Sequence, residues 1–311
     1  MDCEKGEGIE LAKKYNIRGY PTFYLINSQE QPIFVFMGYA KEYWTEKMNQ
    51  ALSDLSTIAE KKEKFEKQPD ETLARMLADY AYAKNELEEA FAYLKKVKKL
   101  NPHASRELNI EMFQIVYSGY RANQFTLDTL KATVKEVLND SLKEKNKANL
   151  LFSMARLLPK APDDQQLIAY LQDLIKLIRS KPDILRESSK TEAEILNCLY
   201  VEKDVKKALQ KKKATLPQGW QENANQLNAF AWWCFENQVN LEEAEQLARK
   251  AVALATSAKD RANILDTLAE ILSLRGKHQE AINTEKKALE LDPQRKLFKQ
   301  NLERFKERAG L

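Results

Sequence analysis

The residues that could carry redox chemistry are three cysteines, Cys3, Cys198 and Cys234. Thiol–disulfide exchange needs a thiolate with a lowered pKa and a second thiol that releases the mixed disulfide. No two of these cysteines lie close in sequence, and an odd number does not make a disulfide framework. We therefore predict that Cys3 is an incidental thiol at a strand end, and that Cys198 and Cys234 are small core residues. Catalysis by this chain alone is not expected.

Other patterns that carry chemistry are missing from the sequence. The two histidines, His103 and His278, have no company at metal-ligand or catalytic-triad spacing, so we interpret both as structural or solvent-facing. Gly6 and Gly8 lack the strand context and the further glycines of a dinucleotide- or phosphate-binding loop. The sequence thus predicts no catalytic residue, no metal site and no cofactor.

The charge of the chain is nearly balanced. Its 50 Lys and Arg and 46 Asp and Glu leave a net charge of +4 over 311 residues. This balance argues against a nucleic-acid-binding protein, because such proteins normally carry a basic stripe. Apolar residues make up 43% of the chain, but no apolar run reaches the length of a membrane span.

The first 58 residues follow an order of helix, loop, two strands and helix. An amphipathic helix ends at 11–15, and the loop 17–22 reads Ile-Arg-Gly-Tyr-Pro-Thr. Two apolar strands are predicted over 22–26 and 33–37, and a second amphipathic helix over 41–54. Because a two-stranded hairpin is marginal in water, it needs cover from helix 41–54, from the helices that follow, or from a lost half-domain.

This order, together with the Gly-Tyr-Pro-Thr loop, resembles the C-terminal half of a thioredoxin-like domain. The resemblance implies a cis bond before Pro21, with Tyr20, Pro21 and Thr22 forming half of a substrate-binding groove. The alternative is an ordinary trans proline that opens a strand. In the family this loop faces a Cys-x-x-Cys motif on the preceding half, and this chain contains no such motif. The resemblance implies a chain truncated at its N-terminus and inactive in redox exchange as written.

An internal repeat begins after residue 70. Residues 71–102 and 262–293 share small, apolar and turn residues 191 positions apart. The matched positions are Leu77 and Leu268, Ala78 and Ala269, Asn85 and Gly276, Ala90 and Ala281, Val97 and Ala288, and Pro102 and Pro293. A weaker copy covers residues 225–256.

These positions have a physical meaning. Small residues let two antiparallel helices approach closely, Asn or Gly suits the left-handed turn between them, and proline stops the second helix. The pattern resembles the tetratricopeptide repeat, a helix–turn–helix unit. Residues 262–293 depart from it mainly at Glu285, where a large apolar residue is usual, and residues 225–256 at Trp232, in a small-residue position. The resemblance implies a helical array that binds proteins or peptides along a concave face.

The stretches between these modules are less distinctive. Residues 105–222 have helical spacing and are divided by prolines into helix-sized pieces, which degenerate helical hairpins would explain. Residues 60–69 are strongly charged and end at Pro69, so we predict a solvated helix end or a linker there.

Aromatic residues are densest over 230–235, where Phe230, Trp232, Trp233 and Phe235 lie. Aromatic residues on a helix are most often core residues. The alternative is an anchor pocket on the concave face of the helical array. On that reading, Asn228, Trp232 and Leu265 are the candidate peptide-binding residues.

We therefore predict a mainly α fold, in which a partial thioredoxin-like α/β segment precedes an α-helical, tetratricopeptide-like solenoid. The expected domains are 1–58, a divergent helical repeat region 70–222, and repeats over 223–311. One predicted function is a truncated thiol–disulfide oxidoreductase, whose redox activity would belong to a longer parent that could be exported. The alternative is a non-enzymatic scaffold that binds partner proteins or peptides. No signal peptide is visible, and the localisation stays open.

Overall fold

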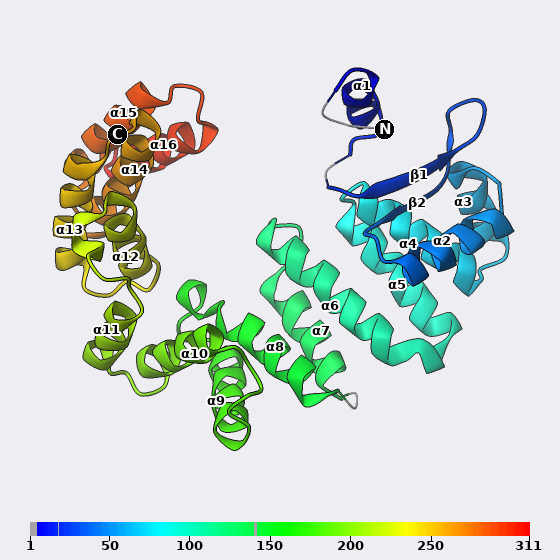
Figure 1. The fold of residues 1–311 in the computed structure, drawn as a ribbon, viewed down its shortest axis with the longest axis horizontal. Helices are drawn as coiled ribbons and strands as arrows, with labels where there is room; N and C mark the ends of the chain where they lie inside the picture. Colours follow the sequence, from blue (N-terminus) through cyan, green and yellow to red (C-terminus); the bar gives the residue numbers. More distant parts are fainter. Residues whose placement is uncertain (1–4, 18, 140–141) are drawn as a thin grey trace. The chain divides into compact units, whose positions relative to one another are not determined.

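The computed structural model describes residues 5–17, 19–139 and 142–311, and most of these residues are helical (Figure 1). Their contacts divide the chain into two compact units, residues 1–143 and 144–311. The mainly α fold with a small hairpin, predicted from the sequence, is confirmed. The domain boundaries predicted at residues 58 and 222 stay predictions, since the division found here follows Lys143.

The first unit opens with the predicted order of elements. These are α1 (Glu7–Lys14), β1 (Thr22–Ile26), β2 (Pro32–Met37), α2 (Lys41–Ser53) and α3 (Ile58–Lys67). The two strands are antiparallel, with Phe23 opposite Phe36 and Leu25 opposite Phe34. The turn between them is closed by Asn27, whose side-chain oxygen accepts a hydrogen bond from the backbone N–H of Gln31 at 2.9 Å.

The hairpin is covered by helices of the same unit. All four residues from Ile33 to Phe36 are buried, so β2 is covered on both of its faces. Phe34 and Phe36 share an apolar core with Ala51 of α2 and Met76 of the next helix, α4. The cover that the sequence left open therefore comes from helix α2 and from the helices that follow.

The charged stretch 60–69 was predicted to be a solvated helix end or a linker, but most of it belongs to the packed helix α3. Thr57 and Glu60 form a capping box at the start of α3, in which the Thr57 N–H donates to Glu60 Oε2 at 2.7 Å. Lys61 and Phe65 are buried on the inner side of this helix. The Lys61 ammonium donates hydrogen bonds to the carbonyl oxygens of Asp54, at 2.8 Å, and Ser56.

The rest of the first unit consists of helical hairpins. Its elements are α4 (Glu71–Ala83), α5 (Leu87–Leu100), η1 (Pro102–Ala104), α6 (Ser105–Arg121) and α7 (Leu127–Asn139). Helix α4 packs against α5, and α6 against α7. Ala78 and Ala90 are buried, and Asn85 takes the left-handed conformation with φ 63°, as the repeat pattern predicts.

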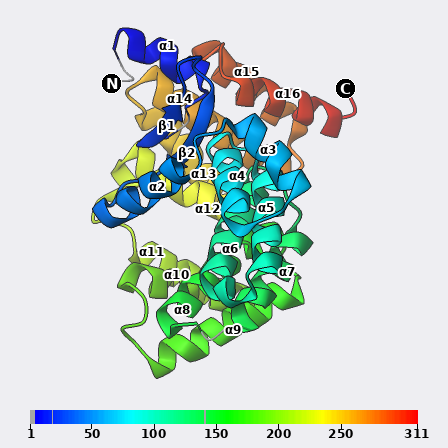
Figure 2. The same cartoon turned by 90° about the vertical axis from the view of Figure 1, so that its right-hand side faces the viewer.

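The second unit continues the same kind of pairing. Its elements are α8 (Glu144–Ala155), η2 (Leu158–Lys160), α9 (Gln165–Ser180), α10 (Glu187–Tyr200), α11 (Val205–Ala214), η3 (Trp220–Glu222), α12 (Ala224–Glu236), α13 (Leu241–Leu254), α14 (Ala258–Leu274), α15 (His278–Leu291) and α16 (Lys296–Arg308). The stretch 105–222 is helical, with α6 packed on α7, α8 on α9 and α10 on α11, and its description as a divergent repeat region stays a prediction. Helices α14 and α15 pack closely and lie side by side in both views (Figures 1 and 2).

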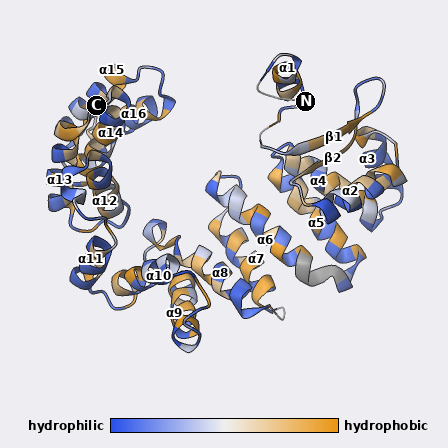
Figure 3. Cartoon of the chain, viewed as in Figure 1, coloured by the Kyte–Doolittle hydropathy of each residue, from blue (hydrophilic) through white to orange (hydrophobic). Residues whose placement is uncertain are grey.

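Apolar residues gather on the sides of the helices that meet a neighbour, while polar residues colour the other sides (Figure 3). In the second unit one core joins α12, α14, α15 and α16 through Phe230, Leu272, Ile282 and Phe305. Ala269 and Ala281 are fully buried, and Gly276 has φ 78° at the turn between their helices. The predicted roles of these small and turn residues are confirmed.

Candidate functional site

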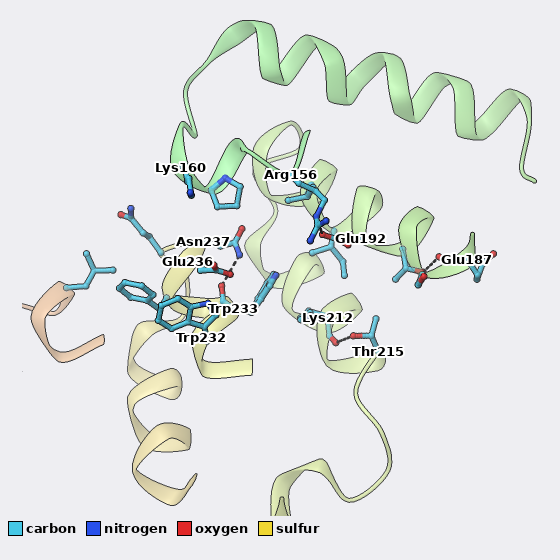
Figure 4. Close-up of a pocket in the computed structure, with 18 of the residues that line it drawn as sticks. Arg156, Lys160, Glu187, Glu192, Lys212, Thr215, Trp232, Trp233, Glu236 and Asn237 are labelled. Carbon is cyan, nitrogen blue, oxygen red and sulfur yellow. Dashed lines mark hydrogen bonds and ion pairs between the residues drawn. The ribbon is translucent and has the colours of Figure 1, made fainter. Parts of the chain in front are cut away.

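A pocket of about 840 Å³ lies entirely within the second unit. Its wall consists of the end of α8, the segment η2, one side of α10 and the end of α11, together with the C-terminal ends of α12, α14 and α16 (Figure 4). The volume falls in the upper part of the range typical of ligand sites, about 300–1,000 Å³. Because seven elements meet here, the pocket is a product of helix packing and not of one loop.

Aromatic rings from α12 form part of the apolar wall of the pocket. Asn223 caps this helix by accepting hydrogen bonds from the backbone N–H groups of the first turn. The inner face of α12 buries Phe230 and Cys234, which leaves Trp232 and Phe235 partly exposed on the pocket side. Their ring centroids are 5.0 Å apart with the planes tilted by 42°, a separation at which aromatic pairs attract.

The end of α12 is fixed by a polar chain. The Asn237 side chain donates to the Trp233 carbonyl oxygen at 2.8 Å and accepts from the Tyr200 hydroxyl at 2.8 Å. Burial raises the pKa of Tyr200, so the phenol keeps its proton and remains a donor. These hydrogen bonds join α10 to the C-terminal end of α12, the helix that carries both tryptophans.

Charged side chains surround the aromatic wall, and several of them are paired. Arg156 Nε lies 2.9 Å from Glu192 Oε1, and Arg304 pairs with the buried carboxylate of Glu270. Arg308 donates to Ser273 Oγ at 3.2 Å. The Lys212 ammonium lies 5.6 Å from the centre of the Trp233 ring, which is within the range of a cation–π contact.

A buried acidic cluster lies behind Arg304. Asp266 and Glu270 on α14 and Glu285 on α15 are all buried, and Asp266 accepts a hydrogen bond from the Asn301 amide at 2.7 Å. Glu285 is fully buried, and within the described residues neither of its carboxylate oxygens has a hydrogen-bond donor. Burial, and then the negative charge of Asp266, raise the pKa of Glu285 to about 9. A proton therefore stays on this carboxyl group at neutral pH.

The structure separates the residues that the sequence proposed for peptide binding. Trp232 lines the pocket. Asn228 lies one turn earlier on α12, outside the pocket wall, and its side-chain oxygen is buried without a donor among the described residues. Leu265 is buried against Ala288 and Phe298 and leaves little surface for a peptide. Their role in peptide binding stays a prediction.

Tyr20, Pro21 and Thr22, the predicted substrate-binding residues, belong to the first unit and have no part in this pocket. The Tyr20–Pro21 bond is cis, as the resemblance implies. Tyr20 is exposed, the Pro21 carbonyl oxygen accepts from the Gly38 N–H at 2.9 Å, and the Thr22 hydroxyl donates to the Gly19 carbonyl at 2.6 Å. That Tyr20, Pro21 and Thr22 bind a substrate stays a prediction.

Sequence reasoning missed the cationic part of the pocket. Lys160, Lys212 and Arg308 come from η2, α11 and α16, which are far apart in sequence. Among 50 basic residues, nothing in the sequence distinguishes these three. Phe235 belongs to the aromatic cluster over 230–235, which is the sequence feature that indicates the pocket.

The cysteines and possible metal ligands do not form a second site in the described part of the chain. Cys198 and Cys234 are buried, and burial raises the pKa of both thiols, that of Cys234 to about 12. Such thiols form little thiolate, which is the nucleophilic form. Cys3 lies outside the described residues. No group of three or more His, Cys, Asp or Glu among the described residues suits a metal ion, and no described helix is long and apolar enough to cross a membrane.

The family model of the tetratricopeptide repeat matches residues 234–294. This stretch is tetratricopeptide-like. The match begins in the last turns of α12 and continues through α13, α14 and α15, so it contains the module 262–293 and reaches the pocket at Phe235 and Leu274. No curated protein matches the sequence.

Two solved structures resemble the fold. One is YrrB, described as a TPR protein with an unusual peptide-binding site, at 14% identity and a TM-score of 0.30 over 77% of this chain and 96% of that one. The other is yeast Tom70, at 18% identity and a TM-score of 0.41 over 88% of this chain. The alignment spans 54% of the Tom70 chain. Neither score is high enough to transfer a property to this protein.

Proposed function

We propose that this protein binds partner proteins, and that the pocket of the second unit docks an extended segment of the partner. The observation that carries this proposal is the pair of partly exposed rings, Trp232 and Phe235, in a large pocket of a tetratricopeptide-like region. Aromatic anchors that fill or line a pocket supply most of the affinity at protein interfaces. Such a role needs neither a nucleophile nor a cofactor, so the scaffold is favoured over the oxidoreductase.

A displayed random-peptide library tests this function. Peptides enriched on the wild-type protein are remeasured by fluorescence polarisation against Trp232→Ala and Phe235→Ala. We expect each change to weaken binding by about tenfold or more, as the loss of an interface anchor does. The matched control is Tyr82→Ala, which removes an aromatic side chain that is 43% exposed in the first unit. If every enriched peptide is indifferent to both pocket changes, the pocket is not the docking site.

We also propose, as a second and separate reading, that the first 58 residues are a thioredoxin-like segment without redox activity of their own. The order of β1, β2 and α2 supports the segment, and the lack of paired cysteines supports its inactivity. We expect no reduction of insulin by dithiothreitol above a control without protein. Turnover that disappears on Cys3→Ser would contradict this proposal.

A further inference from the structure

The charges that line the pocket do not cancel. Five cationic side chains and three glutamates line it: Arg156, Lys160, Lys212, Arg304, Arg308, Glu187, Glu192 and Glu236. Arg156 is neutralised by Glu192, Arg304 by Glu270, and Glu187 by the neighbouring Lys190. What remains is a surplus of positive charge in the lining of the pocket.

Three cations make up this surplus. Within the described residues, no carboxylate lies within ion-pair distance, 4.0 Å, of Lys160, Lys212 or Arg308. In the same way, no cation lies within this distance of Glu236, one of the lining acids. In Figure 4, Lys160 and Lys212 lie apart, with Glu236 and Asn237 between them. The free cations are therefore spread around the aromatic wall instead of forming one patch.

We propose that the pocket takes an acidic peptide segment, in which a large apolar side chain packs on Trp232 and Phe235 and flanking carboxylates meet Lys160, Lys212 and Arg308. This inference rests on the proposed docking function and names the chemistry of the ligand. Charge-assisted hydrogen bonds from lysine and arginine to carboxylates are about twice as strong as neutral ones. The contact with the Trp233 ring keeps the Lys212 ammonium at the wall.

The geometry favours separate carboxylates over a continuous polyanion. Glu236, the lining glutamate without an ion pair among the described residues, interrupts the cationic surface, so a phosphate backbone or an anionic membrane would meet like charge. The net charge of +4 over 311 residues also provides no basic stripe. A peptide can place one carboxylate at each cation and keep an apolar residue at the tryptophans.

The test uses fluorescein-labelled nonapeptides with a central Leu or Phe. The flanking residues are Asp and Glu in one set, Asn and Gln in the second, and Lys and Arg in the third. We expect the acidic set to bind at least tenfold tighter than the amide set at low salt. This preference should shrink at high salt, because ions screen exposed charges. The cationic set should not bind measurably.

A triple variant locates the preference in the pocket. Lys160→Gln, Lys212→Gln and Arg308→Gln together should remove most of the preference for acidic peptides, so that the acidic and amide sets bind with similar affinity. The matched control carries Lys206→Gln, Lys259→Gln and Lys287→Gln, which make the same change in net charge at exposed residues outside the pocket. The control should keep the preference, and circular dichroism checks that both variants are folded.

The possible outcomes separate this inference from the proposed function. If the acidic and amide sets bind equally and both depend on Trp232, docking stands and the acidic ligand is wrong. If no set depends on Trp232, the docking function itself is wrong. If the control variant loses the preference for acidic peptides to the same extent, the preference comes from the net charge of the protein and the inference is overturned. Tighter binding of anionic vesicles or single-stranded RNA than of the acidic peptides, removed by the pocket triple variant, would overturn it as well.

Discussion

The helix pairs α4–α5 and α14–α15 use the same small residues at the same crossing, yet they differ at the positions beside it. Three matched positions, again 191 residues apart, carry different chemistry in the two pairs. They are Arg75, Asp79 and Leu94 in the first pair, and Asp266, Glu270 and Glu285 in the second. The first pair thus has one acid, one cation and an apolar residue, whereas the second has three acids.

In each pair a neighbouring element supplies the counter-charge. Lys47 of α2 pairs with Asp79 in the first unit, and Arg304 of α16 pairs with Glu270 in the second. Glu285 differs, because no cation among the described residues forms an ion pair with it, and it is neutralised by keeping its proton. The comparison teaches that the small residues define the helix crossing, while the next element decides which polar residues the pair can bury.

The largest expected effect comes from moving the unusual acid into the first pair. Leu94 is buried, and Leu94→Glu would place a carboxyl group in the core of the first pair. We expect the free energy of unfolding to fall by about 3–5 kcal/mol, the cost of an uncompensated buried charge. Urea denaturation followed by circular dichroism measures it, with Leu94→Met as the volume-matched control. A cost close to that of the control would mean that both pairs accept an acid equally well.

The stability of the second pair should depend on pH through Glu285. Between its ordinary pKa of 4.5 and its folded value of about 9, the folded state keeps a proton that the unfolded chain releases. The free energy of unfolding should therefore fall as pH rises through this window, by about 1.4 kcal/mol per pH unit from this group. The contribution is fully present below pH 4.5 and is lost above about 9.

A matched pair of variants isolates that dependence. Glu285→Gln keeps the shape of the side chain and removes its titration, whereas Glu290→Gln does the same at an exposed position of the same helix. In a Trp44→Phe background, all remaining tryptophans lie in the second unit and report its unfolding. The stability difference between wild type and Glu285→Gln should change with pH, and the difference for Glu290→Gln should not. A flat difference for both would show that Glu285 ionises normally.

Glu285→Leu should make the second pair resemble the first. Replacing a buried ionisable group by an apolar residue of similar volume is often stabilising, by about 1–4 kcal/mol. We expect a gain within this range at pH 8, measured by the same tryptophan fluorescence during urea denaturation. Loss of stability would instead show that the protonated Glu285 makes a valuable hydrogen bond to Asp266.

The smallest effects concern the crossing that the two pairs share. Ala281→Leu and Ala90→Leu should each cost about 1–3 kcal/mol, because both alanines are fully buried at a close approach of helices. Lys287→Ala, at an exposed position, should change the free energy of unfolding by less than about 0.5 kcal/mol. Unequal costs at the two alanines would show that the two crossings differ in closeness. Thermal unfolding of the three variants makes this comparison.

The sequence predicts the helix pairs well because their determinants are local. A small residue, a turn residue and a proline recur at fixed spacing around Ala78, Asn85 and Pro102, and each has its effect within its own module. The hairpin of the first unit is equally local, with its strands bounded by turn residues. The helix α3 escaped this reasoning, because Lys61 occupies an inward position where the pattern expects an apolar residue.

The pocket could be predicted only in part. The aromatic cluster around Trp232 is a local signal, and the sequence already offered an anchor pocket as one interpretation of it. The cations give no local signal, since Lys160 and Arg308 are far apart in sequence and line the same pocket only after the helices between them have packed. The sequence showed that Glu285 departs from the tetratricopeptide pattern. It could not show that Glu285 lacks a hydrogen-bond partner, because this depends on which side chains of α16 pack near it.

The buried amine of Lys61 has a practical consequence. Its nitrogen is enclosed, it donates to two carbonyl oxygens, and burial lowers its pKa. An acylating reagent cannot reach this nitrogen while α3 is packed, although it can label exposed lysines such as Lys64 on the same helix. The extent of acetylation at Lys61, measured by mass spectrometry of the peptides, therefore reports the opening of α3. The ratio of label at Lys61 to label at Lys64 records how often this helix opens in the intact protein.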